Sequence, residues 1–266
     1  MIEQSEKSAS AGAPASPNDP IVRPIRAADI NDAWAKGIED FRAAPAYGLM
    51  FGAFYAAGGI VVLFALAALD FWHLAYPLAA ALAFIGPFAA IGLYEVSRRR
   101  EAGLSLSWHT LFAAVCNQRN LGLAWMGLVT VFFVVVWIYL VQLLVPLFLG
   151  RSAFGSLDDF LVALTMTSAG LMFLFLSNAI GVLLSIALFS ITFVSFPLLL
   201  DRHVNFLTGI ITSLRAVLIS PLAAIGWAVI TVLLLVVACL PVFLGLLVVL
   251  PVLGHTTWHL YRKIVV

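Results

Sequence analysis

Charged side chains are scarce in this sequence. Only 10% of its 266 residues are Asp, Glu, Lys or Arg, whereas a soluble domain carries about 25%. Hydrophobic residues make up 63% of the chain, and the mean hydropathy is +1.09. This composition excludes an ordinary soluble domain and predicts an all-α, polytopic membrane protein.

The residue patterns that common active sites need are also missing. The two cysteines, Cys116 and Cys239, are too few for a disulfide framework or a cysteine metal cluster. No hydrolytic triad, glycine-rich phosphate loop or pair of catalytic carboxylates can be recognised. The basic residues form no nucleic-acid footprint outside the short loops. We therefore expect a protein that is not an enzyme, has no cofactor and binds no nucleic acid.

The first 28 residues contain no apolar segment. They are rich in Ser, Ala and Pro, with prolines at positions 14, 17, 20 and 24. A cleavable signal needs an apolar stretch of roughly 7–15 residues. We therefore predict a disordered cytoplasmic tail over residues 1–28, followed by an integral membrane domain over residues 29–263.

Long apolar runs alternate with short charged loops in the rest of the chain. A helix needs about 20 apolar residues to cross the hydrocarbon. The pattern predicts six transmembrane helices, at about 48–69, 74–95, 121–148, 171–197, 222–239 and 242–260. The uncharged run 161–200 is ambiguous, because it could hold two crossings. We interpret it as an interfacial or re-entrant approach followed by one crossing.

The positions of Lys and Arg favour this interpretation. With six spans, thirteen basic residues face one side of the membrane and only Arg151 faces the other. A second crossing within 161–200 would change these counts to nine and five. Cytoplasmic loops carry the excess of basic residues in membrane proteins. We therefore predict six spans with both termini in the cytoplasm.

A common pattern occurs three times, in units at about 29–100, 105–203 and 204–263. Each unit has an amphipathic surface helix, a hydrophobic hairpin with a proline in its returning span, and a charged exit. Such surface helices are expected to lie in the headgroup plane, and the pattern predicts three parallel repeats around a common axis. Their apolar faces are Ile30, Trp34, Ile38 and Phe41 in the first unit, and Phe206, Ile210, Leu214 and Val217 in the third.

Three segments carry a resemblance to a known family. They are Phe196-Pro-Leu-Leu-Leu-Asp-Arg202, Thr212-Ser-Leu-Arg-Ala-Val217 and Pro251-Val-Leu-Gly-His-Thr-Thr-Trp-His-Leu-Tyr-Arg262. They are similar to the signature blocks of domain-of-unknown-function family 2189, whose members are predicted bacterial integral membrane proteins. The resemblance extends over roughly residues 25 to 263. It implies six helices in the bacterial inner membrane and no established activity.

The last of these segments holds the clearest candidate for a ligand site. His255 and His259 are four residues apart and share a helix face, as metal or haem ligands from one helix would. His203 could approach from the same side of the membrane. No cysteine, and no carboxylate except Asp201, completes a ligand set nearby. The alternative, which we favour, is that the histidines are interfacial hydrogen-bonding groups at a helix end.

Basic residues gather at the predicted cytoplasmic face. This rim consists of Arg98, Arg99, Arg100, Asp201, Arg202, Arg215 and Arg262. Its arginines could bind anionic lipid headgroups or a partner protein. They could also only set the topology and pair with Asp201, and we favour this second interpretation.

Polar and small residues inside the predicted spans indicate helix contacts. Gln142 and Asn178 are expected at similar depth, where an amide pair would pin two helices together. A substrate site is the alternative, but no ionisable residue accompanies them. Gly48, Gly52 and Ala56 form a face of small residues on the first span, which suits close packing within the chain.

These features lead to one main functional expectation and two alternatives. We expect a non-enzymatic membrane protein that organises lipid or a partner complex, with the bilayer, anionic lipids and an unidentified protein as its partners. The first alternative is a small-solute transporter or channel, although the spans lack the charges that usually mark such pathways. The second is a haem- or metal-binding redox or oxidase-associated protein that uses the histidines.

Overall fold

The computed structural model describes residues 20–69, 71–116, 121–150 and 156–266, and the all-α prediction is confirmed for them. The one pairing of extended backbone in these ranges is an isolated antiparallel bridge between Val22 and Val265. Most of the predicted tail, residues 1–19, and Arg151 lie outside the described residues. The elements are α1 (Ala27–Ala43), α2 (Pro45–Leu69), η1 (Trp72–Leu74), α3 (Ala75–Glu101), α4 (Trp108–Cys116), α5 (Leu121–Leu149), α6 (Leu157–Thr165), α7 (Ser168–Thr192), α8 (Ser195–Asp201), α9 (Phe206–Ile219), α10 (Pro221–Cys239) and α11 (Leu246–Ile264).

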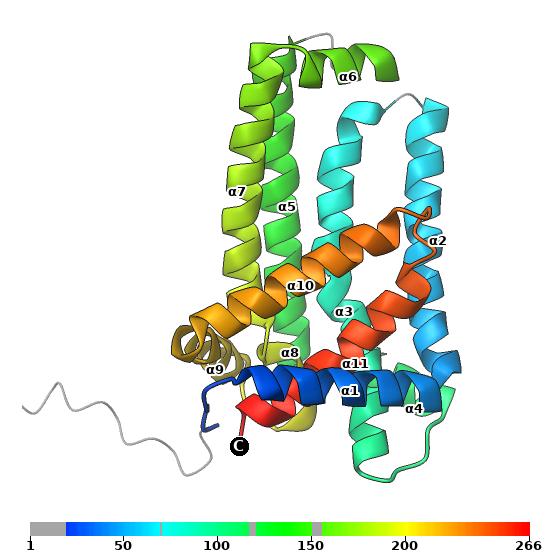
Figure 1. Ribbon diagram of the computed structural model, residues 1–266, viewed down its shortest axis with the longest axis vertical. Coiled ribbons are helices and arrows are strands. Elements are labelled where there is room, and N and C mark those ends of the chain that lie inside the picture. Colours follow the sequence, from blue (N-terminus) through cyan, green and yellow to red (C-terminus); the bar gives the residue numbers. More distant parts are fainter. Residues whose placement is uncertain (1–19, 70, 117–120, 151–155) are drawn as a thin grey trace, which may run out of the picture.

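Four long helices run along the length of the molecule. Figure 1 shows α2 beside α3 and α5 beside α7, all roughly parallel to the long axis. The short helix α6 lies across one end of this bundle, while α1, α4, α8 and α9 lie at the other. We call these the α6 end and the α1 end. The helices α10 and α11 form a hairpin that slants upward from the α1 end.

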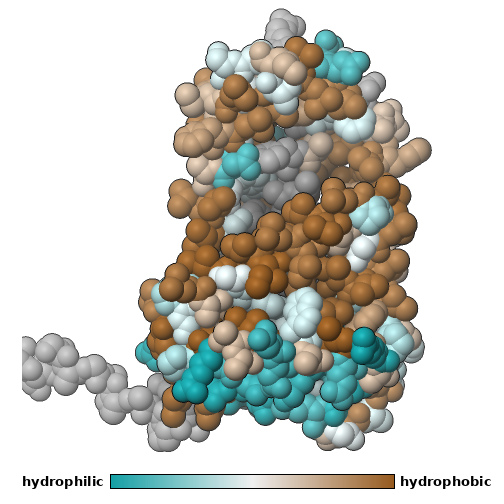
Figure 2. Space-filling model, viewed as in Figure 1, coloured by the Kyte–Doolittle hydropathy of each residue, from teal (hydrophilic) through white to brown (hydrophobic). Residues whose placement is uncertain are grey.

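Several helices have the length and composition of membrane spans. In the described part of the chain, four helical stretches are long and apolar enough to cross a bilayer: Pro45–Leu69, Leu121–Leu149, Ser168–Asp201 and Pro221–Cys239. Figure 2 shows hydrophobic surface over the flanks of the bundle, with hydrophilic side chains at the α1 end and again near α6. The predicted second and sixth spans fall in α3 and α11, which are not among these four. The count of six therefore stays a prediction.

The ambiguous run 161–200 contains one long helix. Ser156 caps the N-terminus of α6, where its side chain accepts from the backbone N–H of Asp159. After α6 ends, Thr167 caps α7 by accepting from the N–H of Gly170. These caps satisfy donors that a helix start leaves unpaired, so they fix the break between the two helices. The short helix across the bundle end and the long helix after it are the geometry expected for an approach followed by one passage.

The surface helix α1 buries a different face from the one predicted. Its buried residues are Ala33, Gly37 and Asp40, whereas the predicted apolar face is only half-buried. The reason is the close approach of α11, since a Cβ atom on Gly37 would lie 2.8 Å from the backbone nitrogen of Thr256. Only small side chains allow this distance between two helices.

The surface helix α9 packs on the protein through a face that was not singled out from the sequence. It buries a face of small residues, Gly209, Thr212, Ser213 and Ala216, and Ser213 Oγ accepts from the N–H of Val194 at 3.1 Å. Its exposed face is apolar and consists of Leu207, Ile211, Leu214 and Leu218. Lipid is as apolar as leucine, so a helix in a membrane packs through small residues and leaves its large ones outside.

The small face of α2 packs against α11, as the sequence predicts. Gly48, Gly52 and Ala56 are all buried. A Cβ atom on Gly48 would lie 2.8 Å from Cβ of Pro251, and one on Gly52 would lie 2.7 Å from Cα of Leu247. The predicted intrachain contact of these small residues is confirmed.

The main core lies at the α1 end, around the C-terminal half of α11. Trp258, Leu260 and Tyr261 are buried there together with Phe196 and Trp227. A second cluster between α5 and α7 is built around Trp137 and Phe173. The last two turns of α11 are therefore enclosed by protein. The segment of α11 that precedes them is apolar and faces α10.

Candidate functional site

Five polar side chains from three helices meet at the α1 end, and we call them the polar network. They are Asp40 on α1, Ser97 and Arg100 on α3, and His255 and His259 on α11. His259 Nε2 lies 2.8 Å from Asp40 Oδ2, and Arg100 Nε donates to Asp40 Oδ1 at 2.7 Å. Ser97 Oγ lies 2.8 Å from His255 Nδ1. The polar network therefore joins three helices that are far apart in the sequence.

Asp40 is ionised in this network although only 5% of the residue is exposed. Burial opposes its ionisation, but the interactions with His259 and Arg100 outweigh that effect and lower the pKa of Asp40 to about 2. A buried charge of this kind is tolerated because each carboxylate oxygen has a partner. Asp40 is thus the centre of the polar network.

The two histidines of α11 have separate partners. His255 is fully buried, with Nδ1 at Ser97 and Nε2 without a hydrogen-bond partner. His259, one turn later, is paired with Asp40. His203 is exposed in the connection from α8 to α9. Across the described ranges, no group of three or more His, Cys, Asp or Glu side chains is placed to hold a metal ion. His255 and His259 therefore make separate contacts between helices, His255 with α3 and His259 with α1.

Asp40 and Ser97 were not among the residues singled out from the sequence. Asp40 lies on the polar side of an amphipathic helix, which is the usual position of a solvated carboxylate. Its spacing from Ala33 and Gly37 places it on the same face as two small residues. That combination, a carboxylate on a face of small residues, is the signal that could have identified it.

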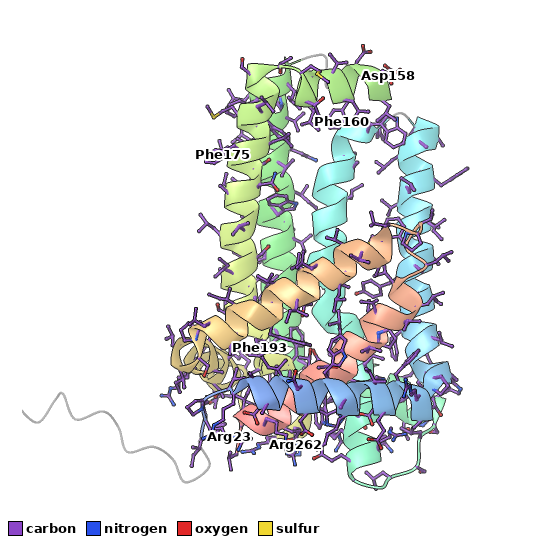
Figure 3. All side chains as sticks on the ribbon, in the orientation of Figure 1. Arg23, Asp158, Phe160, Phe175, Phe193 and Arg262 are labelled. Carbon is purple, nitrogen blue, oxygen red and sulfur yellow. The ribbon has the colours of Figure 1, made fainter. Side chains whose placement is uncertain are left out.

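A second polar cluster surrounds the end of α11. Arg262 Nε lies 3.1 Å from Glu101 Oε1, and its Nη1 lies 3.3 Å from Asp201 Oδ2. Tyr261 donates its hydroxyl proton to Asp201 Oδ2 at 2.8 Å, and Trp258 donates Nε1–H to Glu101 at 3.1 Å. Figure 3 shows Arg262 at the α1 end, close to Arg23 and far from Asp158 at the α6 end. The predicted pairing of Asp201 with an arginine is confirmed.

Most arginines of the predicted rim have partners within the chain. Arg98 and Arg99 bind the buried carboxylate of Glu95 at 2.7 and 2.6 Å, and Arg100 binds Asp40. Arg202 donates to the carbonyl of Val266 at 3.4 Å. Arg215 is exposed and has no ion pair within the described residues. Contacts within the chain therefore engage the rim arginines other than Arg215.

The two amides predicted to pin the helices do not pair. Gln142 on α5 and Asn178 on α7 are both exposed. Asn178 Nδ2 donates at 2.8 Å to the carbonyl of Leu174, one turn earlier on its own helix. No hydrogen bond joins the two amides in the described part of the chain. The prediction fails because an exposed amide can satisfy itself on its own backbone, without a partner on the next helix.

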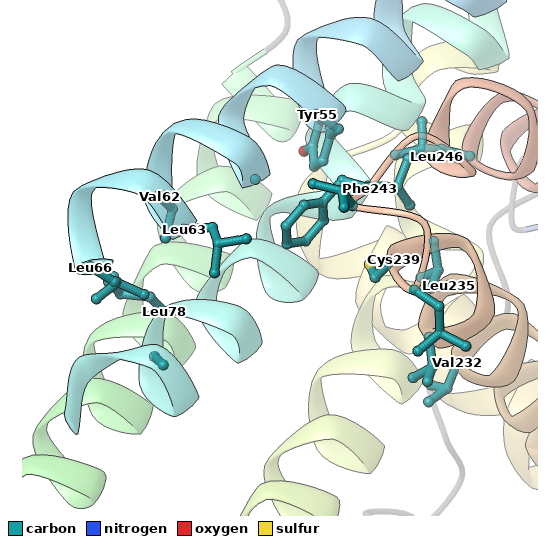
Figure 4. Close-up of a pocket in the computed structure, with 16 residues that line it drawn as sticks. Tyr55, Val62, Leu63, Leu66, Leu78, Val232, Leu235, Cys239, Phe243 and Leu246 are labelled. Atoms are coloured by element: carbon teal, nitrogen blue, oxygen red, sulfur yellow. The ribbon is translucent and has the colours of Figure 1, made fainter. Parts of the chain in front are cut away.

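An apolar cavity of about 670 Å³ lies between α2, α3 and the α10–α11 hairpin. Figure 4 shows side chains from these helices around it, with Leu66 and Leu78 at one end and Phe243 at the turn of the hairpin. Val236 contributes to the wall on α10, and Tyr55 to the wall on α2. No Asp, Glu, Lys, Arg or His is among the described lining residues. Such a cavity fits an apolar ligand and offers nothing to a charged one.

The comparison with protein families agrees with the composition. Residues 75–201 match the family model described as predicted integral membrane protein (DUF2189). The matched segment runs from the first residue of α3 to the last residue of α8, so it is shorter than the predicted resemblance over 25 to 263. The segments 212–217 and 251–262, which carried part of that resemblance, lie outside it.

No curated protein and no solved structure matches the chain. The family match and the apolar helices agree that this is an integral membrane protein. The identified likeness is therefore that the segment from α3 to α8 is similar to the DUF2189 family of predicted integral membrane proteins.

Proposed function

We propose that this protein is a non-enzymatic, multi-pass protein of the inner membrane that organises lipid. In this proposal it holds a hydrocarbon chain of a lipid in the cavity between α2, α3 and the α10–α11 hairpin. The observation that carries the proposal is the cavity itself, which is large, apolar and bounded by the candidate spans α2 and α10. The apolar helix α2 in its wall supports a position of the cavity at the depth of the hydrocarbon. Bilayer lipid is the apolar species that surrounds it there.

The lining supports a chain and not a headgroup. A phospholipid headgroup needs cationic or hydrogen-bonding partners, and the described lining has no charged side chain. The arginines that could supply such partners lie at the α1 end, where they bind Glu95, Asp40 and Asp201. We therefore assign the lipid contact to the cavity, and give the rim the secondary role of fixing topology.

The proposal includes the arrangement of three hairpins. A short helix precedes a helical pair three times along the chain: α1 before α2 and α3, α4 before α5 and α7, and α9 before α10 and α11. This order supports the three repeats expected from the sequence. The excess of Lys and Arg at the α1 end supports a cytoplasmic position for that end. Reporter fusions test this orientation. Fusions after Lys36 and Arg215 should report the cytoplasm, and a fusion after Asp158 should report the opposite side of the membrane.

Lipid binding is tested by filling the cavity. Val236→Trp places a large side chain in the cavity wall, whereas Val237→Trp places the same side chain on the neighbouring position of α10, which does not line the cavity. The two valines are similarly exposed, at 55% and 59%. Native mass spectrometry from membranes should show that Val236→Trp loses bound lipid several-fold, while Val237→Trp retains it like the unmodified protein.

Two results decide the matter. Equal lipid retention in all three proteins contradicts the proposal, provided that each is monodisperse and melts at a similar temperature. If Val236→Trp fails to fold, Leu63→Trp fills the cavity from the opposite wall on α2 and is compared with Val61→Trp on the same helix, which lies outside the lining. Transport and haem binding stay expectations from the sequence, because no feature of the cavity favours them.

A further inference from the structure

We propose that α10 and α11 form a re-entrant hairpin whose tip ends near the middle of the bilayer, and that the chain held in the cavity belongs to a lipid of the leaflet opposite α1. The hairpin tip is residues 240–245, between the two helices. Only the assignment of the lipid chain to a leaflet rests on the proposed lipid binding. The depth of the tip is tested independently.

The contacts between α11 and α2 give the height of the tip. Moving away from the α1 end, Gly48 meets Pro251, Gly52 meets Leu247 and Gly59 meets Phe243, with Cβ positions on these glycines 2.7–2.8 Å from the partner. Phe243 is in the hairpin tip, so the tip reaches α2 at Gly59. From Ile60 to Leu69, α2 continues for about 15 Å beyond the tip.

A distance of about 15 Å is half of the hydrocarbon thickness. Figure 1 shows the same relationship, with the α10–α11 turn beside the middle of α2 while α2, α3, α5 and α7 continue toward the α6 end. The helix α10 is long enough for a full crossing. Because it is inclined to the bundle axis, however, its rise along that axis is shorter than its length. The hairpin therefore occupies the half of the bilayer nearer to α1.

The sequence of the hairpin tip fits hydrocarbon and not water. The tip reads Leu240-Pro-Val-Phe-Leu-Gly245 and has no polar side chain. Leu240, Val242 and Leu244 are exposed on the protein surface. Turns that lie in water are normally built from Ser, Asn, Asp and Gly. Apolar side chains at this exposure are unfavourable in water and cost nothing in lipid.

Several backbone donors in and next to the tip are satisfied within the protein. Irregular backbone at membrane depth must satisfy its polar groups within the protein. The N–H groups of Phe243, Leu244 and Leu246 donate to the carbonyls of residues 239, 241 and 243 at 3.0–3.1 Å. Pro241 has no N–H to satisfy. The chain reverses inside this tight turn because Val242 and Phe243 adopt left-handed φ angles of 52° and 63°.

The cavity extends past the tip on the side away from α1. Its lining includes Leu66 near the end of α2, and Ala75 and Leu78 at the start of α3. The connection between those two helices lies toward the α6 end in Figure 1. The tip residues Leu240 and Phe243 also line the cavity, and Tyr55 and Leu250 continue the lining on the α1 side of the tip. The space above the tip thus belongs to the leaflet that faces α6, and a lipid of that leaflet can supply its chain.

The depth of the tip is measured first. A full-length chain with Cys116→Ser, Cys239→Ser and Leu244→Cys is labelled with an environment-sensitive fluorophore and reconstituted. Phospholipids brominated near the chain ends should quench it several-fold more than lipids brominated near the carbonyls, and aqueous iodide should not quench it. Lys36→Cys and Asp158→Cys in the same background are the controls at the two ends, and iodide should quench both. Quenching of the Leu244→Cys probe by iodide or by the carbonyl-proximal bromine overturns the re-entrant hairpin.

The leaflet is measured next, in vesicles whose protein orientation is established with the Lys36→Cys and Asp158→Cys chains. A phospholipid with a photoreactive group at its chain end is added to one leaflet only. Crosslinks to segments 55–66 or 232–243 should form several-fold more often from the leaflet facing α6. Equal crosslinking from both leaflets overturns the leaflet assignment. A deep tip without crosslinks from either leaflet contradicts the proposed lipid binding and leaves the re-entrant hairpin in place.

Discussion

Asp40 and His259 are 219 positions apart in the chain, yet the Asp40 carboxylate lies 2.8 Å from Nε2 of His259. The first helix is thereby fastened to the last one. Arg100 completes the contact from α3, so one buried carboxylate joins three elements. The strength of this junction can be measured without knowledge of the physiological ligand.

Asp40→Asn removes the charge at nearly constant shape. Arg100 and His259 then lose their common partner in a largely buried site. Breaking a buried ion pair costs about 3–5 kcal/mol, but Arg100 is a quarter exposed and can turn toward water, so we expect a loss of about 2 kcal/mol. Thermal or denaturant unfolding in detergent measures it. Asp32→Asn is the matched control on α1, because Asp32 is paired with Lys36 and Lys263 at the surface, and it should leave the melting temperature unchanged.

Stability should fall at low pH because of the same carboxylate. The pKa of Asp40 is about 2 in the folded protein, below its ordinary value of 3.8, so the folded state binds this proton less readily than the unfolded state. The stabilisation is complete above about pH 4 and is lost as the pH falls from about 4 to about 2. It amounts to about 2 kcal/mol. Unfolding curves across this pH range should show the loss in the unmodified protein, and a loss of the same size in Asp40→Asn would contradict the assignment.

Two glycines of α2 should respond in opposite ways to substitution by alanine. A Cβ atom on Gly52 would lie 2.7 Å from Cα of Leu247, whereas one on Gly58 would meet nothing within 4 Å. Gly52→Ala should therefore force α2 and α11 apart and cost about 1–3 kcal/mol. Gly58→Ala should be neutral or should stabilise the helix by up to about 1 kcal/mol. Equal effects of the two changes on the melting temperature would show that α11 does not pack on α2 in this register.

Variants of Ser97 and His255 distinguish a packing role of His255 from a role in ligand binding. Ser97→Ala removes the side-chain partner of Nδ1 of the fully buried His255, whose Nε2 already has none, and this costs about 1–3 kcal/mol. In the double variant Ser97→Ala, His255→Leu both polar groups are gone, and much of that loss should be regained.

Lipid retention supplies the second readout for this pair. It should be unchanged in the double variant if His255 only packs. A stable double variant that no longer retains lipid would give His255 a part in ligand binding, although His255 is not among the described lining residues of the cavity.

The sequence predicted those features that depend on local pattern. The small face at Gly48 and Gly52, the single long helix within 161–200 and the pairing of Asp201 with an arginine were all found in the structure. Each follows from neighbours in the chain or from residues that must lie near one membrane face. Apolar composition also predicted the membrane class correctly, because charged residues are too costly in the hydrocarbon to occur there by chance.

The orientation of the surface helices and the centre of the site could not be predicted in this way. The apolar stripe of α9 was expected in the headgroup plane, but the sequence did not show that Gly209 and Ser213 form the face that packs on the protein. Asp40 could not be identified because its partners Arg100 and His259 are 60 and 219 positions away in the chain. The α10–α11 hairpin has the composition of two spans, and only its contact with Gly59 shows how far it extends along α2.

The contact between Asp40 and His259 also sets an order of events during synthesis. At about 5–20 residues per second, roughly 10–40 seconds separate the appearance of these two residues. Throughout that interval α1 lacks the helix against which Ala33, Gly37 and Asp40 are buried. The α1 end is therefore assembled last, after α11 has been synthesised. This holds for any order in which the long helices enter the membrane.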